Sequence, residues 1–210
     1  MGRTGRHATT RCILIALDDN GYAALSAGAS VIEADAFGPK VLLRPDGDYL
    51  KLFRRKRLLS SALWRPYARR FADNALALKT RGIPCPEVLA VYRQKSLARD
   101  IVHYRPLPGS TIRQLIAAGI ADAAAESLRL RLRDFFAGLH GLGIYFRSAH
   151  LGNIVLMPDN RLGLIDIADL QLKNRPLAPG LRRRNYQHIL RYPADREWLC
   201  ISPGWAGLGR

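Results

Sequence analysis

The spacing of apolar residues changes once along this chain, near residue 110, and this change restricts the possible folds most. Before that point, short apolar runs alternate with turn residues, which is typical of strands. The predicted strands are residues 29–34, 40–44, 49–53, 87–92 and 100–104. Two helices are expected in the same half, a short one at 18–27 and the main one at 66–80.

After residue 110 the apolar residues follow a helical period. Helices are predicted at 111–118 and 123–142, and the basic and aromatic tail at 181–200 is also expected to be helical. In the longest helix one apolar stripe is expected to face the core, formed by Leu128, Leu132, Phe135 and Leu139. Two short strands, 153–157 and 161–165, interrupt this half.

This order of elements predicts an α+β fold in two lobes. A chain of 210 residues suits one such unit. We expect a β-rich N-terminal lobe with one main helix at 29–104 and a reduced α-helical C-terminal lobe at 105–210. Residues 1–28 are expected to form an N-terminal extension that precedes the first lobe.

The chain is strongly basic, with 33 Lys and Arg against 17 Asp and Glu and a formal charge of +16. Such an excess favours a polyanionic partner: nucleic acid, an anionic membrane surface or a phosphorylated glycolipid. Two basic clusters stand out, formed by Arg54, Arg55, Lys56 and Arg57 and by Arg182, Arg183 and Arg184. No helix-turn-helix pattern or aromatic RNA-binding motif accompanies them, so nucleic acid is the least favoured partner.

The sequence also favours one compartment. The longest apolar run covers only residues 12–17, whereas a membrane span needs about 20 residues. That run is also too short for a secretory signal. Three scattered cysteines, Cys12, Cys85 and Cys200, argue against a disulfide framework and against zinc. We therefore expect a cytoplasmic protein that is peripheral at the inner membrane.

Three polar residues stand in or beside apolar segments. Lys51 lies in the middle of the predicted strand 49–53, Asn153 begins the strand 153–157, and Asp166 follows the strand 161–165. Each alone has an ordinary explanation, as an edge lysine, a turn asparagine or a capping aspartate. Together they match phosphoryl transfer, in which a lysine neutralises nucleotide phosphates and the oxygens of Asn and Asp hold Mg²⁺.

The surrounding segments make this match more specific. Residues 139–156 read LHGLGIYFRSAHLGNIVL, residues 163–168 read GLIDIA, and residues 47–57 read GDYLKLFRRKR. With 81–89 and 103–115, these segments resemble, in order and spacing, the protein-kinase-like superfamily and within it the lipopolysaccharide core kinase family, which includes the Kdo kinases. The resemblance spans about residues 29–192.

The resemblance implies that ATP and Mg²⁺ bind between the two lobes. It assigns Lys51 to the phosphates of ATP and assigns Asn153 and Asp166 to the metal. The segment from Tyr104 to Leu107 is expected to border the adenine. The implied activity is phosphorylation of a core-sugar hydroxyl on a lipid A–core precursor.

The segment that resembles the catalytic loop departs from the family pattern. Ser148 stands where the catalytic aspartate belongs, and a serine hydroxyl is no carboxylate base. His150 is a candidate substitute base because the ordinary pKa of histidine is about 6.5. The alternative is that His150 only hydrogen-bonds the loop backbone. Asp169 is a further candidate, with helix capping as its ordinary explanation.

Two further departures concern the N-terminal lobe. It has no G-x-G-x-x-G motif, and only Gly38 lies in the first hairpin. The carboxylate that pairs with the strand lysine in the family is not evident here. Asp73 or Asn74 falls in that neighbourhood of the main helix, and Asp73 is expected to join the cofactor site.

These observations leave three function classes. The favoured one is a lipopolysaccharide-kinase-type phosphotransferase. The second is a pseudokinase, a scaffold that binds nucleotide or anionic lipid without turnover, and Ser148 favours it. The third is a nucleic-acid-binding protein, which only the charge supports.

Overall fold

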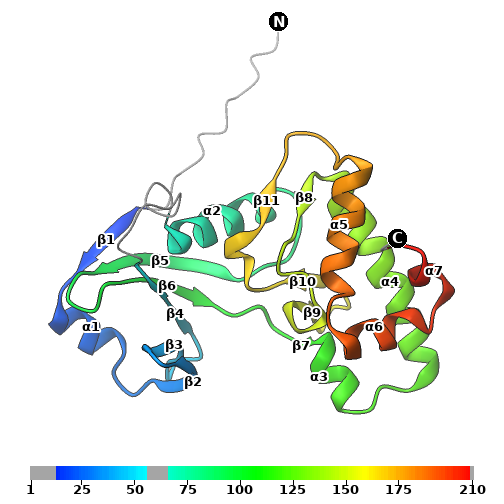
Figure 1. Ribbon diagram of the computed structural model, residues 1–210. Helices are drawn as coiled ribbons and strands as arrows, with labels where there is room; N and C mark the ends of the chain where they lie inside the picture. The colour runs from blue at the N-terminus through cyan, green and yellow to red at the C-terminus, as the bar shows by residue number, and fades with distance from the viewer. Residues whose placement is uncertain (1–12, 56–65, 209–210) are drawn as a thin grey trace, which may run out of the picture.

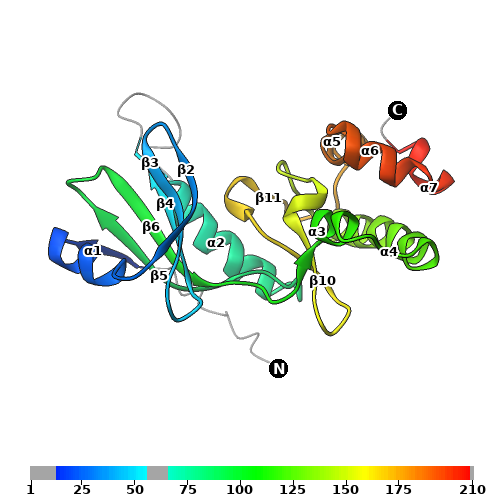
Figure 2. The same cartoon turned by 90° about the horizontal axis from the view of Figure 1, so that it is seen from below.

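We describe residues 13–55 and 66–208 of a computed structural model. Within these residues the chain is a mixed α+β structure with one six-stranded sheet and seven α-helices. Figures 1 and 2 show this sheet and most of the C-terminal helices at opposite ends of the molecule. The α+β class predicted from the sequence is confirmed.

The large sheet is built from the N-terminal half of the chain. Its strands are β1 Leu14–Leu17, β2 Ser30–Asp35, β3 Gly38–Leu43, β4 Tyr49–Arg54, β5 Glu87–Gln94 and β6 Arg99–Arg105. They lie in the order β1-β5-β6-β4-β3-β2, and all neighbours are antiparallel except β1 and β5. Strands β2 to β6 fall close to their predicted positions.

The N-terminal boundary differs from the prediction. Residues 1–28 were expected to precede the first lobe, yet β1 is an edge strand of its sheet, with Leu14 opposite Val91. The short helix α1 (Asp19–Leu25) follows, capped by the Asp18 side chain, which accepts from the N–H of Gly21. A parallel pairing between segments so far apart leaves no local signal in the sequence.

The β3–β4 hairpin sets the position of Lys51. The predicted turn closes where the N–H of Arg44 donates to Asp48 O at 2.8 Å, with Gly47 at a φ of +86° that favours glycine. In this register Lys51 lies opposite Val41 on β3 and Val102 on β6. Successive side chains of a strand point to opposite faces of the sheet. Leu50 and Leu52 point into a small core on one face, so Lys51 points to the other face. That core contains Leu42, Leu50, Leu52 and Ile101.

Helix α2 (Tyr67–Lys79) packs on the face of the sheet that carries Lys51. Its buried residues, including Phe71 and Leu78, join Val91 and Val102 in the main hydrophobic core. The same core continues into the helical part of the chain through residues such as Leu132. The sheet and the helices are therefore joined by continuous packing as well as by the backbone.

The C-terminal half contains helices and short strands. The helices are α3 Ile112–Ala117, α4 Asp122–Gly141, α5 Pro179–Ile189, α6 Pro193–Cys200 and α7 Pro203–Ala206, with single 3₁₀ turns at Leu151–Asn153 (η1) and Ile167–Asp169 (η2). The short strands are β7 Ser110–Thr111, β8 Ile144–Tyr145, β9 Ile154–Leu156, β10 Leu162–Leu164 and β11 Gln171–Leu172. Strands β10, β9 and β7 form one small sheet, and β11 pairs with β8.

The buried face of α4 differs from the prediction by one residue. Leu128, Leu132 and Leu139 are buried as expected, but Phe136 is fully buried and Phe135 only half-buried. Both phenylalanines fit a helical period, and the neighbouring aromatic rings decide between them. Phe136 packs edge-on against the indole of Trp205 at 6.2 Å. The sequence period alone does not distinguish i+3 from i+4 at this point.

The helices and the cysteines of the structure can be compared with the expectation of a cytoplasmic protein. Among the described residues, every helix is too short or too polar to cross a bilayer. Cys85 and Cys200 are free thiols, and burial raises the pKa of the Cys85 thiol to about 11.

The buried His140 makes the stability of the fold depend on pH. Its side chain is 1% exposed, its Nε2 lies 3.1 Å from Asn185 Oδ1, and burial lowers the pKa of the imidazole below its ordinary 6.5. The unfolded chain therefore takes up a proton at a higher pH than the folded one. This contribution to stability is present above pH 6.5 and is lost as the pH falls toward the lowered pKa.

We accordingly expect urea unfolding to give a smaller free energy of unfolding at pH 5.5 than at pH 7.5. In His140→Gln, which keeps a hydrogen-bonding side chain but cannot titrate, the difference between the two pH values should shrink. An unchanged difference in that variant would assign the pH dependence to other groups.

Candidate active site

An ion pair joins two residues that are 115 positions apart in the sequence. Lys51 Nζ on β4 lies 2.5 Å from Oδ1 of Asp166, which directly precedes η2. The Asp166 side chain is 45% exposed and that of Lys51 is 19% exposed. The large sheet and the C-terminal half therefore meet at a carboxylate that a ligand can reach, beside an ammonium group held against the sheet.

The backbone of Asp166 is unusual. Its φ of +53° and ψ of +50° lie in the left-handed region, which residues other than glycine adopt uncommonly, although asparagine and aspartate do so more often than most. Such a conformation costs about 1–3 kcal/mol and is found most often at functional sites. Asp166 follows the β9–β10 hairpin, whose ladder runs from Leu156 opposite Leu162 to Ile154 opposite Leu164.

The same hairpin brings Asn153 beside Asp166. The N–H of Ile165 donates to Asn153 O at 3.0 Å, which extends the ladder by one step. The Asn153 side chain is buried, and its Nδ2 donates to Ser148 O at 3.0 Å. This hydrogen bond orients the amide. The structure thus gathers Lys51, Asp166 and Asn153 in one region.

Ser148 is bonded to Asp169, which the sequence analysis considered only as a further candidate base or a helix cap. Its Oγ donates to Asp169 Oδ2 at 2.8 Å, from the loop before η1 to the last residue of η2. The other oxygen of Asp169 is buried and has no hydrogen-bond partner among the described residues. The capping role considered for Asp169 is not what its side chain performs.

His150 performs the structural role that was considered for it. Its Nδ1 accepts from the N–H of Gly152 at 3.1 Å and so caps η1. The ring also packs edge-on against Tyr192 at 5.3 Å. Burial, and then the charge of Arg113, lower the pKa of His150. The backbone hydrogen bond therefore agrees with the ordinary explanation of this histidine, and the Nδ1 lone pair is already in use.

Helix α6 contacts the loop around Ser148 and Leu151 through Asp195. Oδ2 of the buried Asp195 accepts from the N–H of Leu151 at 2.9 Å, and the same carboxylate is paired with Arg113 through two bonds of 2.8 and 2.9 Å. Sequence reasoning missed this pair. A lone aspartate in a basic tail carries no local signal, and its partner lies 82 residues earlier.

The sequence left the partner of Lys51 open, with Asp73 or Asn74 in the expected neighbourhood on the main helix. In the structure the ammonium group pairs with Asp166. Asn74 is buried, and its amide donates to Ile167 O at 2.7 Å and to Leu170 O at 3.1 Å. It therefore fixes the segment around η2 rather than the lysine.

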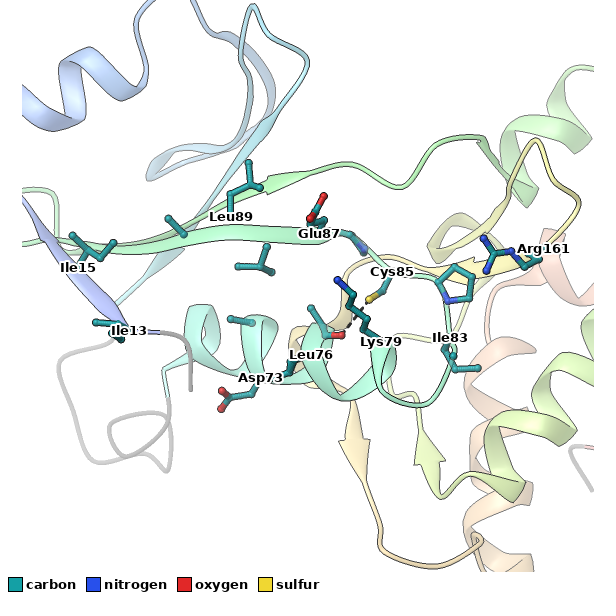
Figure 3. A pocket seen from close by; sticks show the side chains of 17 residues that line it. Ile13, Ile15, Asp73, Leu76, Lys79, Ile83, Cys85, Glu87, Leu89 and Arg161 are labelled. Atoms are coloured by element: carbon teal, nitrogen blue, oxygen red, sulfur yellow. Dashed lines mark hydrogen bonds between the residues drawn. The ribbon is translucent and has the colours of Figure 1, made fainter. Parts of the chain in front are cut away.

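Asp73 lines a different pocket. A cavity of about 800 Å³ lies between α2, β1 and β5, and Figure 3 shows the side chains that line it, including Asp73, Lys79 and Cys85. Neither Lys51 nor Asp166 is among its lining residues. The structure thus places Asp73 in this cavity, away from the site at which it was expected to bind a cofactor.

Of the two residues expected beside the adenine, Tyr104 lies near the end of β6 and Leu107 lies on the connection that follows. Tyr104 stacks between Tyr49 and Phe71, at ring distances of 5.7 and 5.4 Å, and burial raises the pKa of its phenol. Leu107 contacts Gly163 of β10 so closely that a Cβ there would lie 2.4 Å from its side chain. Leu107 therefore borders β10, the strand that leads to Asp166.

The basic clusters are only partly described. Arg54 and Arg55 are exposed, and the guanidinium of Arg54 lies 3.7 Å from the centre of the Phe37 ring. Lys56 and Arg57 lie outside the described residues. The second cluster lies on α5 and comprises the exposed residues Arg182, Arg183 and Arg184.

The donor set fits Mg²⁺ better than a transition metal. Asp166 offers an accessible carboxylate, and Asn153 adds an amide oxygen one ladder step away. Across residues 13–55 and 66–208, no group of three or more His, Cys, Asp or Glu gathers as a metal cluster. Mg²⁺ needs no such cluster, because it is usually held by one or two protein oxygens together with phosphates and water.

No protein-family model matches this chain, and no curated protein matches it.

Proposed function

We propose that this protein is an ATP-dependent phosphotransferase of the lipopolysaccharide kinase type. It would phosphorylate a core-sugar hydroxyl of a lipid A–core precursor at the cytoplasmic face of the membrane. The observation that carries this proposal is the meeting of Lys51 and Asp166 at 2.5 Å across 115 residues, with Asn153 beside them.

The arrangement of the chain supports the proposal. Residues 29–104 contain five of the six strands of the large sheet and its one main helix, residues 105–210 are mainly helical, and the ion pair connects these two parts. This is the order expected for two kinase-like lobes with a nucleotide site between them. The motif resemblance and the site geometry therefore point to the same residues.

Phosphoryl transfer depends mainly on positioning and charge stabilisation. In the proposed reaction Lys51 binds the phosphates of ATP and neutralises their charge. Asp166 and Asn153 hold the metal, and bound Mg²⁺ stabilises the negative charge on the transferred group. The strained backbone of Asp166, the β9–β10 hairpin and Asn74 keep these oxygens in place before substrate arrives.

The acceptor follows from the charge of the protein. A formal charge of +16 and the exposed arginines of α5 favour a negatively charged substrate or surface. A phosphorylated glycolipid in an anionic membrane is a negatively charged substrate and lies in a negatively charged surface. Nucleic acid remains the least favoured partner because no recognition motif accompanies the charge.

One observation favours a second function, that of a pseudokinase. Position 148 is a serine instead of a carboxylate, and the Nδ1 of His150 is occupied by a backbone N–H. A protein with this loop would bind MgATP, or anionic lipid, without transferring phosphate. The two functions differ in turnover and share the same nucleotide site.

The deciding experiment uses purified protein, MgATP labelled in the γ-phosphate, and anionic vesicles that contain a lipid A–core precursor. The proposed function predicts label on the glycolipid, and a Lys51→Ala variant should lose it. Binding of MgATP without label on any precursor would support the pseudokinase. No binding of MgATP at all would contradict both functions.

The arginines of α5 should contribute to membrane binding. Each Lys or Arg near an anionic surface is worth roughly 1 kcal/mol, so replacing Arg182, Arg183 and Arg184 by Gln should weaken vesicle binding by roughly 100-fold at low salt. Sedimentation with anionic vesicles measures this loss. Neutral vesicles provide the control, and unchanged binding would exclude this surface from the interaction.

A further inference from the structure

The bond between Ser148 and Asp169 places a carboxylate directly behind the residue at the catalytic-loop position. Ser148 Oγ donates to Asp169 Oδ2 at 2.8 Å. Ser148 and Asp169 are both half-buried, and Oδ1 of Asp169 is buried. A substrate hydroxyl bound at Ser148 Oγ would therefore be connected to the carboxylate through the serine.

The carboxylate of Asp169 is not accounted for by the packing around it. Its Oδ1 accepts no hydrogen bond from the described residues. Leaving a buried acceptor unsatisfied costs about 1–3 kcal/mol, and such groups call for a specific explanation. Its segment is nevertheless firmly held, because Asn74 binds the carbonyls of Ile167 and Leu170 on either side.

The hydrogen bond between Ser148 and Asp169 is connected to the proposed magnesium site. Asn153 holds the carbonyl of Ser148, and Asp166 and Asp169 stand at the two ends of one 3₁₀ turn. The serine, the carboxylate behind it and both proposed metal ligands therefore form one connected group. A shift of Ser148 would disturb Asn153 as well.

We infer that Ser148 and Asp169 form a proton relay that replaces the missing aspartate of the catalytic loop. This inference rests on the proposed phosphotransferase function. The acceptor hydroxyl gives its proton to Ser148 Oγ, and Ser148 gives its own proton to Asp169 Oδ2. The acceptor oxygen forms a bond to the γ-phosphorus, the bond from that phosphorus to the bridging oxygen breaks, and ADP leaves with the electron pair.

In this scheme Ser148 is the catalytic residue, because it touches the acceptor, and Asp169 acts through it. After transfer Asp169 returns its proton to solvent through the same serine. His150 takes no part as a base, since its Nδ1 accepts from the backbone. The relay thus assigns a role to the serine and to the unpaired carboxylate together.

The test compares variants of the two residues in the full chain. Ser148→Ala removes the relay hydroxyl, and Asp169→Asn keeps the shape of the side chain but cannot take a proton. General-base catalysis contributes about 10²–10⁴-fold, so each variant should lower ADP formation by that factor. Because both act in one step, the double variant should lose no more than the worse single variant. Ser127→Ala and Asp159→Asn, which change exposed residues, are the matched controls.

Two readouts separate a relay from a merely structural bond. Ser148→Thr keeps a hydroxyl and should retain most of the rate. The exchanged variant S148D/D169S puts the carboxylate at the loop position and should exceed both Asp169→Asn and S148D, because in S148D two carboxylates repel each other.

Each assay is run with MgATP in water and with anionic vesicles that carry a lipid A–core precursor, and MgATP binding is measured by thermal shift on the same samples. Full activity in Ser148→Ala or Asp169→Asn, with binding intact, would overturn the relay and leave the phosphotransferase. MgATP binding by the wild type without ADP formation under either condition would overturn both and support the pseudokinase. If the wild type does not bind MgATP, the nucleotide site itself is wrong and the relay is rejected with it.

Discussion

In an Asp166→Ala variant we expect MgATP to give no thermal stabilisation. A ligand present at 100 times its Kd stabilises the folded wild type by about 2.7 kcal/mol, and this whole increment should vanish. The reason is the exposed carboxylate of Asp166, the strongest metal ligand of the proposed site, which also pairs with Lys51 at 2.5 Å. Scanning calorimetry with ATP, with and without Mg²⁺, measures the effect.

The alanine also changes the backbone, since Asp166 adopts the left-handed region at φ +53°. Asp166→Asn is therefore the companion variant, because asparagine tolerates this conformation while losing the charge. It should fold as the wild type does and bind MgATP more weakly. Asp159→Ala, in an exposed turn, controls for loss of one negative charge. A full ATP-dependent shift in Asp166→Ala would show that the metal assignment is wrong.

In Asp195→Ala we expect both a less stable protein and the loss of phosphate transfer. Asp195 is buried, at 3% exposure, and binds Arg113 and the N–H of Leu151. Removing one partner of a buried ion pair costs 3–5 kcal/mol, and we expect the lower end, about 3 kcal/mol, because Arg113 is partly exposed. The Leu151 N–H loses its acceptor, so the loop from Ser148 to Asn153 loses its support.

Chemical denaturation measures the stability of this variant, and the vesicle assay measures its transfer. Asp134→Ala is the matched control, because its exposed carboxylate contacts only the neighbouring Arg133 among the ion pairs of the described residues. Asp195→Asn keeps an acceptor for Leu151 N–H and should recover part of the stability. If Asp195→Ala transfers phosphate at the wild-type rate, α6 does not position the loop.

The local features of this protein follow from the sequence. The hairpin at 45–47, the strands around Lys51 and the helix at 66–80 lie where they were predicted, because alternation, turn chemistry and helical spacing act over a few residues. The order of strands before helices also predicted the α+β class. The candidates Lys51, Asn153 and Asp166 were found in this way, through motifs inside such local elements.

Contacts between distant segments were decided by the tertiary structure alone. Strand β1 joins β5 across more than seventy positions, Asn74 supports η2, and Asp195 binds Arg113. None of these pairings leaves a periodic or compositional trace, since each depends on how packed elements approach one another. For the same reason the helical period of α4 did not distinguish the buried Phe136 from its neighbour.

The candidate site shows most clearly which features the sequence determines and which depend on the tertiary structure. The sequence by itself determined that position 148 is a serine and that carboxylates follow at 166 and 169. Only the fold decided that Asp166 turns to Lys51 while Asp169 accepts from Ser148. The two carboxylates stand at opposite ends of one short turn, which begins with the left-handed Asp166 and is held by Asn74, so their side chains reach different partners.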